Sequence, residues 1–180
     1  MATRPARSRA HARPRPAHSD AALVVLAQSG RRDAFEELVR RHADRLYGTV
    51  RRLGLSREAA DEVVQETFLR AWRAIGTFKG RSQFFTWLYR IGVNESKSRL
   101  ARQPARALVR SLDEDDAVDP PDLRQEPQAL VAHEELRVAL RRAVRALPVK
   151  YRAPLILRDV EGLSTADVAS ILGLSEPALK

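Results

Sequence analysis

Apolar residues recur every three or four positions through most of the first half of the chain. That spacing is typical of amphipathic helices with one face turned toward a core, and the alternation of a half-buried strand appears nowhere in the sequence. The pattern predicts four helices, running from Ser19 or Asp20 to Gly30, from Asp33 to Gly54, from Ser56 to Ile75 and from Ser82 to about Gln103.

Polar residues mark where these helices should begin. Asp33 is followed three residues later by Glu36, the spacing of a capping box, so we expect Asp33 to be the N-cap of the second helix. Ser56 is expected to cap the third helix in the same way. Residues 76–82, Gly-Thr-Phe-Lys-Gly-Arg-Ser, predict a loop before the fourth helix.

The second half of the chain predicts a smaller helical unit. The segment His133–Leu147 is amphipathic, and Pro148 ends it. A further helix spans roughly Val149–Val160. Pro154 lies inside it and lacks the N–H group of a helix interior, so we expect this helix to start late or to bend.

The sharpest local pattern follows Gly162 and is typical of a helix-turn-helix. Ser164 is expected to cap a helix with Asp167 at the capping-box position, and Gly173 to supply the positive φ of a tight turn. Apolar side chains should hold the two helices together: Val168, Ala169, Leu172, Leu174 and Leu179. A helical hairpin unrelated to DNA shares part of this pattern.

The second helix of such a unit enters the DNA major groove with its N-terminal residues. Here that helix should open at Ser175, and the candidate reading residues are Ser175, Glu176, Ala178 and Lys180. The sequence stops five residues after Ser175, and a helix that short is not stable alone. We therefore expect either a C-terminally truncated form or an incomplete reading helix.

The composition limits the classes of function that the protein can have. The 180 residues carry a net charge of +9 and a pI of about 10.9, which favours a polyanionic partner, either nucleic acid or a membrane surface. No apolar stretch approaches a membrane span, and Pro14 and Pro16 interrupt any signal core. The sequence has no cysteine, which excludes disulfides, thiolate zinc sites and thiol catalysis. These features predict a soluble cytoplasmic protein with no cofactor and no metal.

The charge is unevenly distributed. Residues 1–18 hold five arginines, three prolines and no acid. They predict a disordered basic tail that either stays solvated or adds phosphate contacts, although a transit peptide would share this composition. Residues 104–127 contain an acidic, proline-containing run that predicts a flexible linker. The expected fold class is all-α, with two small helical domains at 19–103 and 128–180, the second a winged-helix-like helix-turn-helix.

The fourth predicted helix carries the main binding signal of the first domain. Residues 70–106 include nine basic residues and one acid. At ~100° per residue, Trp87, Arg90, Asn94 and Lys97 share an arc of roughly 80°. The cations suit phosphates, the ring can stack on a base and the amide can bond base edges. The alternative is that Trp87 belongs to the core and the cations form a solvated face.

Several motifs, in this order, resemble the extracytoplasmic-function (ECF) sigma factors of bacterial RNA polymerase, within the sigma-70 family. They are Asp-Glu-Val-Val-Gln-Glu-Thr-Phe at 61–68, Phe-Lys-Gly at 78–80, Phe-Phe-Thr-Trp-Leu-Tyr-Arg-Ile-Gly-Val-Asn at 84–94, Leu-Ser at 163–164 and Gly-Leu-Ser at 173–175. The resemblance covers residues 20–180. It implies a non-enzymatic subunit that directs RNA polymerase to promoters by reading the −35 element and by reading and melting the −10 element.

The resemblance also implies roles for residues of the first domain, which would be sigma region 2. The polar side of the third helix would dock on the clamp helices of the polymerase's largest subunit through Asp61, Gln65 and Glu66. The loop residues Phe78, Lys79 and Arg81 would line or approach a pocket for a base flipped from the −10 non-template strand. The fourth helix would contact the −10 element, single-stranded and duplex, through Trp87, Arg90, Asn94 and Lys97.

The second domain would be sigma region 4, with Ser175, Glu176, Ala178 and Lys180 at the −35 element and the polymerase flap as a further contact. The linker would run near the active-site cleft and the RNA exit path. An anti-sigma factor is a common partner in this group. No membrane and no small-molecule substrate is expected among the partners.

Three other classes compete with this interpretation. A repressor or activator that binds duplex DNA alone would need a dimer interface or a ligand pocket in place of an aromatic, basic helix. An enzyme could hold a metal on the acids of the third helix (Glu58, Asp61, Glu62 and Glu66), but no histidine lies near them and no phosphate-binding loop occurs. A membrane-surface binder would need a broad apolar face beside a basic one, and no helix pairs them convincingly.

Overall fold

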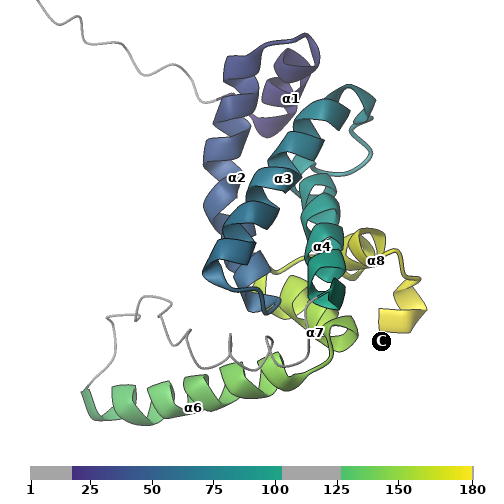
Figure 1. Ribbon diagram of the computed structural model, residues 1–180. Coiled ribbons are helices and arrows are strands. Elements are labelled where there is room, and N and C mark those ends of the chain that lie inside the picture. Colours follow the sequence, from purple (N-terminus) through teal and green to yellow (C-terminus); the bar gives the residue numbers. More distant parts are fainter. Residues whose placement is uncertain (1–17, 103–126, 180) are drawn as a thin grey trace, which may run out of the picture.

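The computed structural model describes residues 18–102 and 127–179. Every regular element within these residues is helical, and none is a strand, in agreement with the apolar spacing. The helices form two domains, the first from α1 to α4 and the second from α6 to η3 (Figure 1). Their bounds are α1 Asp20–Gln28, α2 Arg32–Arg52, α3 Arg57–Ala74, η1 Ile75–Thr77, α4 Phe84–Arg102, α6 Pro127–Ala146, α7 Val149–Leu155, η2 Ile156–Val160, α8 Thr165–Leu172 and η3 Glu176–Leu179. The predicted tail apart from His18, the predicted linker apart from Pro127, and Lys180 lie outside the described residues.

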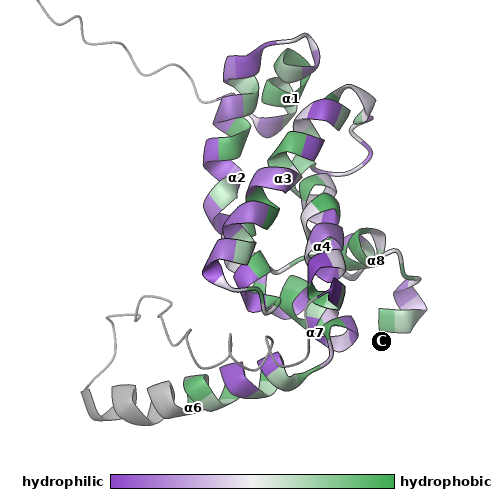
Figure 2. Ribbon diagram, in the orientation of Figure 1, coloured by the Kyte–Doolittle hydropathy of each residue, from purple (hydrophilic) through white to green (hydrophobic). Residues whose placement is uncertain are grey.

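The first domain packs α1 to α4 around one apolar core. Each predicted apolar stripe supplies fully buried side chains, among them Leu38 and Leu46 on α2, Val63 on α3 and Leu88 on α4. Fully burying one such side chain stabilises the fold by about 1.5–3 kcal/mol. Figure 2 shows that α2, α3 and α4 each carry hydrophilic positions beside the hydrophobic ones, as expected for helices with one face in solvent.

Serine caps begin two helices of the first domain at expected starts. The hydroxyl oxygens of Ser19 and Ser56 accept hydrogen bonds from the first turns of α1 and α3, at 3.3 and 3.2 Å. The prediction that Asp33 is the N-cap of α2 is wrong, because the cap lies two residues earlier, at Arg31, and α2 begins at Arg32. Both oxygens of the Asp33 carboxylate instead accept bonds from the Arg31 guanidinium, at 3.0 and 2.7 Å. A carboxylate in the first turn still favours the positive end of the helix dipole.

A glycine lets α4 cross its neighbours closely. A Cβ atom at Gly92 would lie 2.9 Å from Leu46 Cδ1 and 3.4 Å from Thr67 Oγ1. The two contacts come from α2 and α3, so this position sets how deeply α4 sits between them.

The second domain begins with α6, whose N-terminal end points away from the bundle (Figure 1). Its C-terminal half exposes Leu136 and Leu140, so these members of the predicted apolar stripe do not pack in a core. Helix α7 starts directly after Pro148, and Pro154 lies inside it. The next residues, η2, widen into a π-helical turn. Of the two outcomes expected from Pro154, the late start does not occur, and the helix changes from α to π geometry two residues after the proline.

The first helix and the turn of the helix-turn-helix follow the prediction. The Ser164 hydroxyl accepts a bond from the Asp167 backbone N–H at 3.1 Å, and Gly173 has a φ of +67°. Val168 and Ala169 are buried. The described residues after the turn, 174–179, form the short 3-10 helix η3 in place of a helix capped by Ser175. Leu174 is 45% exposed, so the prediction that it fills the space between two helices is wrong, because no full second helix covers it.

A buried carboxylate joins the two domains. Glu161 lies between η2 and α8, and its side chain is 4% exposed. Its carboxylate accepts bonds from Thr49 Oγ1 at 2.6 Å, Arg45 Nε at 2.9 Å, Arg52 Nη1 at 3.2 Å and the Tyr89 hydroxyl at 3.3 Å. All four donors belong to α2 or α4. The carboxylate is therefore fully bonded by the first domain although it belongs to the second.

A buried guanidinium makes a second link. Arg152 on α7 is 2% exposed and donates from Nη1 to the backbone carbonyl of Leu53, at the end of α2, at 2.7 Å. Its other nitrogens donate to the carbonyls of Arg145 and Leu147, at the end of α6 and just beyond it. Burial, followed by the nearby charge of Arg145, lowers the pKa of Arg152. Gly54 leaves room for this side chain, since a Cβ there would lie 2.3 Å from Arg152 Nη1.

Candidate nucleic-acid interface

The predicted binding arc on α4 is present and reaches solvent. Arg90 and Asn94 are exposed, and Lys97 is half-buried, which lowers its pKa. Trp87, the fourth member, is only partly buried and packs against the rim of the core. The structure therefore combines the two interpretations of Trp87, because the ring supports the core with one side while the cations and the amide beside it face solvent.

Three rings connect the arc to the loop before α4. The centroid of Trp87 lies 5.2 Å from that of Phe78 and 5.9 Å from that of Phe84, and the Phe78 and Phe84 centroids are 6.2 Å apart. Phe78 comes from the loop and the other two from the first turn of α4. These separations are typical of favourable aromatic pairs. The structure thus brings the predicted loop and the predicted arc together.

The remaining loop residues predicted to bind DNA are accessible. Lys79 and Arg81 are both exposed, and Gly80 between them has a φ of +66°. A non-glycine residue at that position would be strained. The loop therefore turns sharply between two cations, and both can reach a phosphate or a base edge.

A side chain that the sequence analysis missed holds the start of this loop. Gln28, the last residue of α1, donates from Nε2 to the carbonyl oxygens of Ile75 at 3.0 Å and Phe78 at 2.8 Å. Nothing in the apolar pattern of α1 indicates such a contact. Its only sequence signal is a long amide side chain at a helix end, which is common.

The predicted docking face of α3 is partly free. Asp61 and Gln65 are exposed and lie one helical turn apart. Glu66, the third predicted residue, accepts a bond from Arg70 Nε at 2.6 Å, and Arg70 also pairs with Glu95 of α4 at 2.8 Å. These contacts hold Glu66 toward α4 and leave Asp61 and Gln65 as the accessible pair.

Leu69 extends this face and was also missed. It follows Gln65 by four residues and is 51% exposed. Its signal in the sequence is a leucine out of phase with the buried stripe of α3, which a count of apolar residues does not separate from core positions. An exposed leucine beside polar groups is a common anchor in protein contacts.

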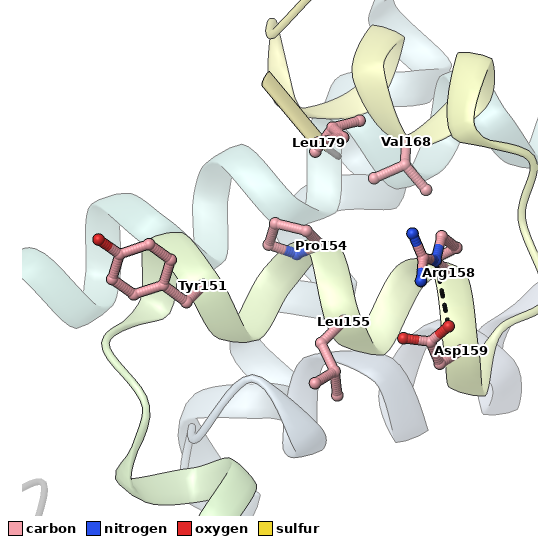
Figure 3. Close-up of a pocket in the computed structure, with 7 residues that line it drawn as sticks. All are labelled: Tyr151, Pro154, Leu155, Arg158, Asp159, Val168 and Leu179. Carbon is pink, nitrogen blue, oxygen red and sulfur yellow. Dashed lines mark hydrogen bonds and ion pairs between the residues drawn. The ribbon is translucent and has the colours of Figure 1, made fainter. Parts of the chain in front are cut away.

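The second domain carries the other predicted DNA-reading residues on a separate surface. Ser175, Glu176 and Ala178 are exposed, and Lys180 lies outside the described residues. The underside of η3 borders a groove of about 230 Å³ between α7, η2 and α8, in which Leu179 and Val168 face Pro154 (Figure 3). Leu179 thus turns the apolar side of η3 toward the domain, and Ser175, Glu176 and Ala178 remain exposed.

Two other classes of site find no support in the described part of the chain. No three His, Asp or Glu side chains there come together in a way that could hold a metal ion, and this includes the acids of α3. Within residues 18–102 and 127–179, no helix is long and apolar enough to span a bilayer.

Two family models match the chain. The model of sigma-70 region 2 matches residues 38–106, and the model of sigma-70 region 4 matches residues 137–180. The first match contains the α3 face, the loop and the α4 arc, and the second contains the helix-turn-helix. Together they define a sigma factor of the two-domain kind.

Known sigma factors are similar in sequence to most of the chain. The RNA polymerase sigma-H factor of Pseudomonas aeruginosa is 33% identical over 158 residues, which are 85% of this chain and 82% of that protein. The ECF RNA polymerase sigma-E factor of Escherichia coli is 36% identical over 159 residues, 86% and 83% of the two chains. The chain therefore belongs to the sigma-70 family, in its ECF group.

Solved structures agree with the fold. CnrH, solved in complex with the cytosolic domain of CnrY, is 30% identical with a TM-score of 0.64, covering 89% of this chain and 86% of CnrH. The sigma factor RpoE from Bartonella quintana, solved with the anti-sigma factor NepR, has a TM-score of 0.58 at 22% identity, covering 81% of this chain and 86% of RpoE. The second likeness supports the fold alone.

Proposed function

We propose that this sigma factor melts and reads the −10 promoter element with the arc on α4 and the loop at 76–82. The observation that carries the proposal is the contact between Phe78 and Trp87, because it joins the exposed loop to the exposed side of α4. One continuous surface then offers an aromatic platform for a base, the Asn94 amide for a base edge, and cations for phosphates.

The energy that melting requires is within reach of such a surface. Opening DNA costs about 1.4 kcal/mol per base step in stacking. Flipping one base therefore costs a few kcal/mol, and stacking of one base on an aromatic side chain supplies about 1–3 kcal/mol. Lys79, Arg81, Arg90 and Lys97 add phosphate contacts, so no chemical fuel is needed.

Docking on the core polymerase is assigned to α3. Asp61, Gln65 and Leu69 are spaced by four residues and share one exposed side of the helix. Glu66 joins this surface once it exchanges Arg70 for a partner on the polymerase clamp helices. An acidic face on a chain of net charge +9 also favours a protein partner at this place over DNA.

The second domain is assigned to the −35 element, through Ser175, Glu176, Ala178 and Lys180, with the polymerase flap as a further contact. The functional units we propose are region 2 at 19–103, the linker at 104–127 and region 4 at 128–180. The protein acts in the cytoplasm, without catalysis or cofactor. Because CnrH was solved with a second protein, the cytosolic domain of CnrY, we also propose a protein partner of the anti-sigma kind.

Run-off transcription tests the proposal. Core polymerase and this protein are incubated with promoter fragments drawn from the source genome, with Asp44→Ala as a matched control, because Asp44 is exposed and lies outside both proposed surfaces. We expect Gln65→Ala to weaken core binding. Asn94→Ala should leave core binding intact and reduce the specific transcript about tenfold, as for the loss of one good base contact.

Two outcomes would overturn the assignment. One is a transcript that survives both substitutions at the level of the Asp44→Ala control. The other is a protein that binds duplex DNA alone as tightly as it does with core polymerase, which would favour a conventional repressor or activator.

A further inference from the structure

One side chain of α1 brackets the turn that leads into the proposed base pocket. The two bonds of the Gln28 amide reach across 47 and 50 residues of sequence, to Ile75 and Phe78. These residues stand at the two ends of that turn, since Ile75 opens η1 and Phe78 follows it. A primary amide has two N–H hydrogens, and here each has its own carbonyl.

The loop has few other restraints among the described contacts. The Phe78 N–H donates to the Ile75 carbonyl at 3.1 Å, and the Thr77 hydroxyl donates to the Ala74 carbonyl at 2.7 Å. Both bonds are local and shape the turn, but neither ties it to another helix. Lys79, Gly80 and Arg81, which follow, are exposed.

Phe78 is therefore held from two sides. Its ring packs against Trp87 and Phe84 of α4, and its backbone carbonyl is fixed by Gln28 of α1. If the carbonyl contact is lost, the ring contacts alone must set the direction in which Lys79 and Arg81 leave the turn. A loop that is not held beforehand loses conformational entropy when DNA binds, and this loss lowers the affinity.

We propose that Gln28 is a positioning residue for promoter melting: it holds the 75–78 turn in the conformation that receives an unpaired −10 base. This inference rests on the proposed function of the 76–82 loop. Gln28 itself contacts no DNA in this scheme. It also lies outside residues 38–106, the part of the chain that the region 2 model matches.

The expected effect follows from the two bonds. Neutral hydrogen bonds contribute modestly to stability, and these two lie near the surface. Their loss should weaken binding to the −10 non-template strand about tenfold, which corresponds to about 1.4 kcal/mol. Binding to duplex −35 DNA and to core polymerase should stay within twofold of wild type, because Gln28 touches neither surface.

The experiment uses holoenzyme assembled from the full chain. The probe is a fluorescent single-stranded oligonucleotide with the −10 non-template sequence of a promoter that wild-type holoenzyme transcribes in the run-off assay. Gln28→Met keeps the length of the side chain and removes both donors. Gln28→Lys restores a donor of similar reach. Val25→Ala, at an exposed position of the same helix, is the matched control.

We expect Gln28→Met to lose about tenfold in single-strand affinity, Gln28→Lys to recover most of it and Val25→Ala to match wild type. Hydrogen exchange should accelerate at the amides of residues 77–82 in Gln28→Met alone. Unchanged single-strand affinity would overturn the inference, as would an equal loss in core and duplex binding, which would indicate a general folding defect. If wild-type holoenzyme transcribes no promoter, it is the proposed function of the loop that fails.

Discussion

The core of the first domain and the contact between the two domains differ in how much buried charge they contain. The core is made of aliphatic and aromatic side chains such as Leu38 and Leu88, both fully buried. The contact between domains continues this apolar core through side chains such as Leu157 and Val168, and it also contains two buried charges, Glu161 and Arg152. Apolar burial is favourable wherever shapes fit, whereas a buried charge is tolerated only while all its partners stay in place. We therefore expect the contact between domains to depend more on single charged residues than the core does.

Truncation of the core should have the largest effect. Leu88→Ala removes a fully buried side chain from α4, and we expect the free energy of unfolding of the first domain to fall by about 2–5 kcal/mol. Urea denaturation followed by tryptophan fluorescence measures it, since Trp72 and Trp87 lie in this domain. Leu69→Ala, at an exposed position of α3, is the control and should change stability by less than about 0.5 kcal/mol.

Removal of the Glu161 carboxylate should have the second largest effect. Glu161→Ala removes the carboxylate that accepts bonds from Arg45 and Arg52, and we expect the docking free energy of the second domain to fall by roughly 2–3 kcal/mol. This is below the 3–5 kcal/mol of a fully buried pair because both arginines are partly in solvent. The first domain should unfold at the same urea concentration as in wild type.

Energy transfer between the domains measures the effect of Glu161→Ala. The sequence has no cysteine, so dyes can be placed at Asp44→Cys on α2 and Ser170→Cys on α8, both exposed positions. Transfer should drop in Glu161→Ala and stay constant in Glu176→Ala, a substitution of an exposed acid on η3. Constant transfer in both variants would mean that the apolar contacts alone hold the domains together.

The smallest effect is a pH dependence at Tyr89, whose hydroxyl donates to the Glu161 carboxylate. Burial, the largest cause, raises the pKa of Tyr89 to about 12. The ordinary value is about 10, so the folded protein keeps the phenol proton between these values while the unfolded chain loses it. The contribution to stability is complete below pH 10 and is lost as the pH rises to about 12. It amounts to roughly 2 kcal/mol.

Stability curves taken between pH 9 and 12 test this. The decline in wild type should be steeper than in Tyr89→Phe, which has no phenol proton to lose. Tyr151→Phe alters an exposed tyrosine and should follow the wild-type curve. If Tyr89→Phe declines as steeply as wild type, the titration of other groups accounts for the whole pH effect.

The sequence predicted the apolar part of the molecule well and the polar contact between domains not at all. The stripes of α1 to α4 follow from a period of 3.6 residues, and the Ser164 cap and the Gly173 turn follow from local chemistry. Glu161 and Arg152 gave no such signal, because their partners are 72 to 116 residues away for Glu161 and up to 99 away for Arg152. Within one helix, a charge destined for burial has the same pattern as a charge in solvent.

In the candidate site, too, the local features could be predicted from the sequence and the long-range contacts could not. The loop and the α4 arc were predictable because helical spacing and turn residues place them. The aromatic contact of Phe78 with Trp87 was not, since it depends on how the loop folds back on α4. The error at Leu174 has a related cause: the prediction assumed a full second helix over the turn, whereas the described residues 174–179 form the 3-10 helix η3.

The docking of α8 on α4 has a consequence for transcription. The Thr86 hydroxyl of α4 donates to the Asp167 carboxylate of α8 at 3.3 Å, so the two helices are in contact. The −10 and −35 elements are centred ~25 base pairs apart, and at ~3.4 Å per base pair they are separated by about 85 Å. A helix is only ~10 Å wide. A single promoter can therefore engage both of the surfaces proposed above for the −10 and −35 elements only after α8 has left α4. Undocking costs free energy, so each ~1.4 kcal/mol of docking free energy lowers the apparent promoter affinity tenfold.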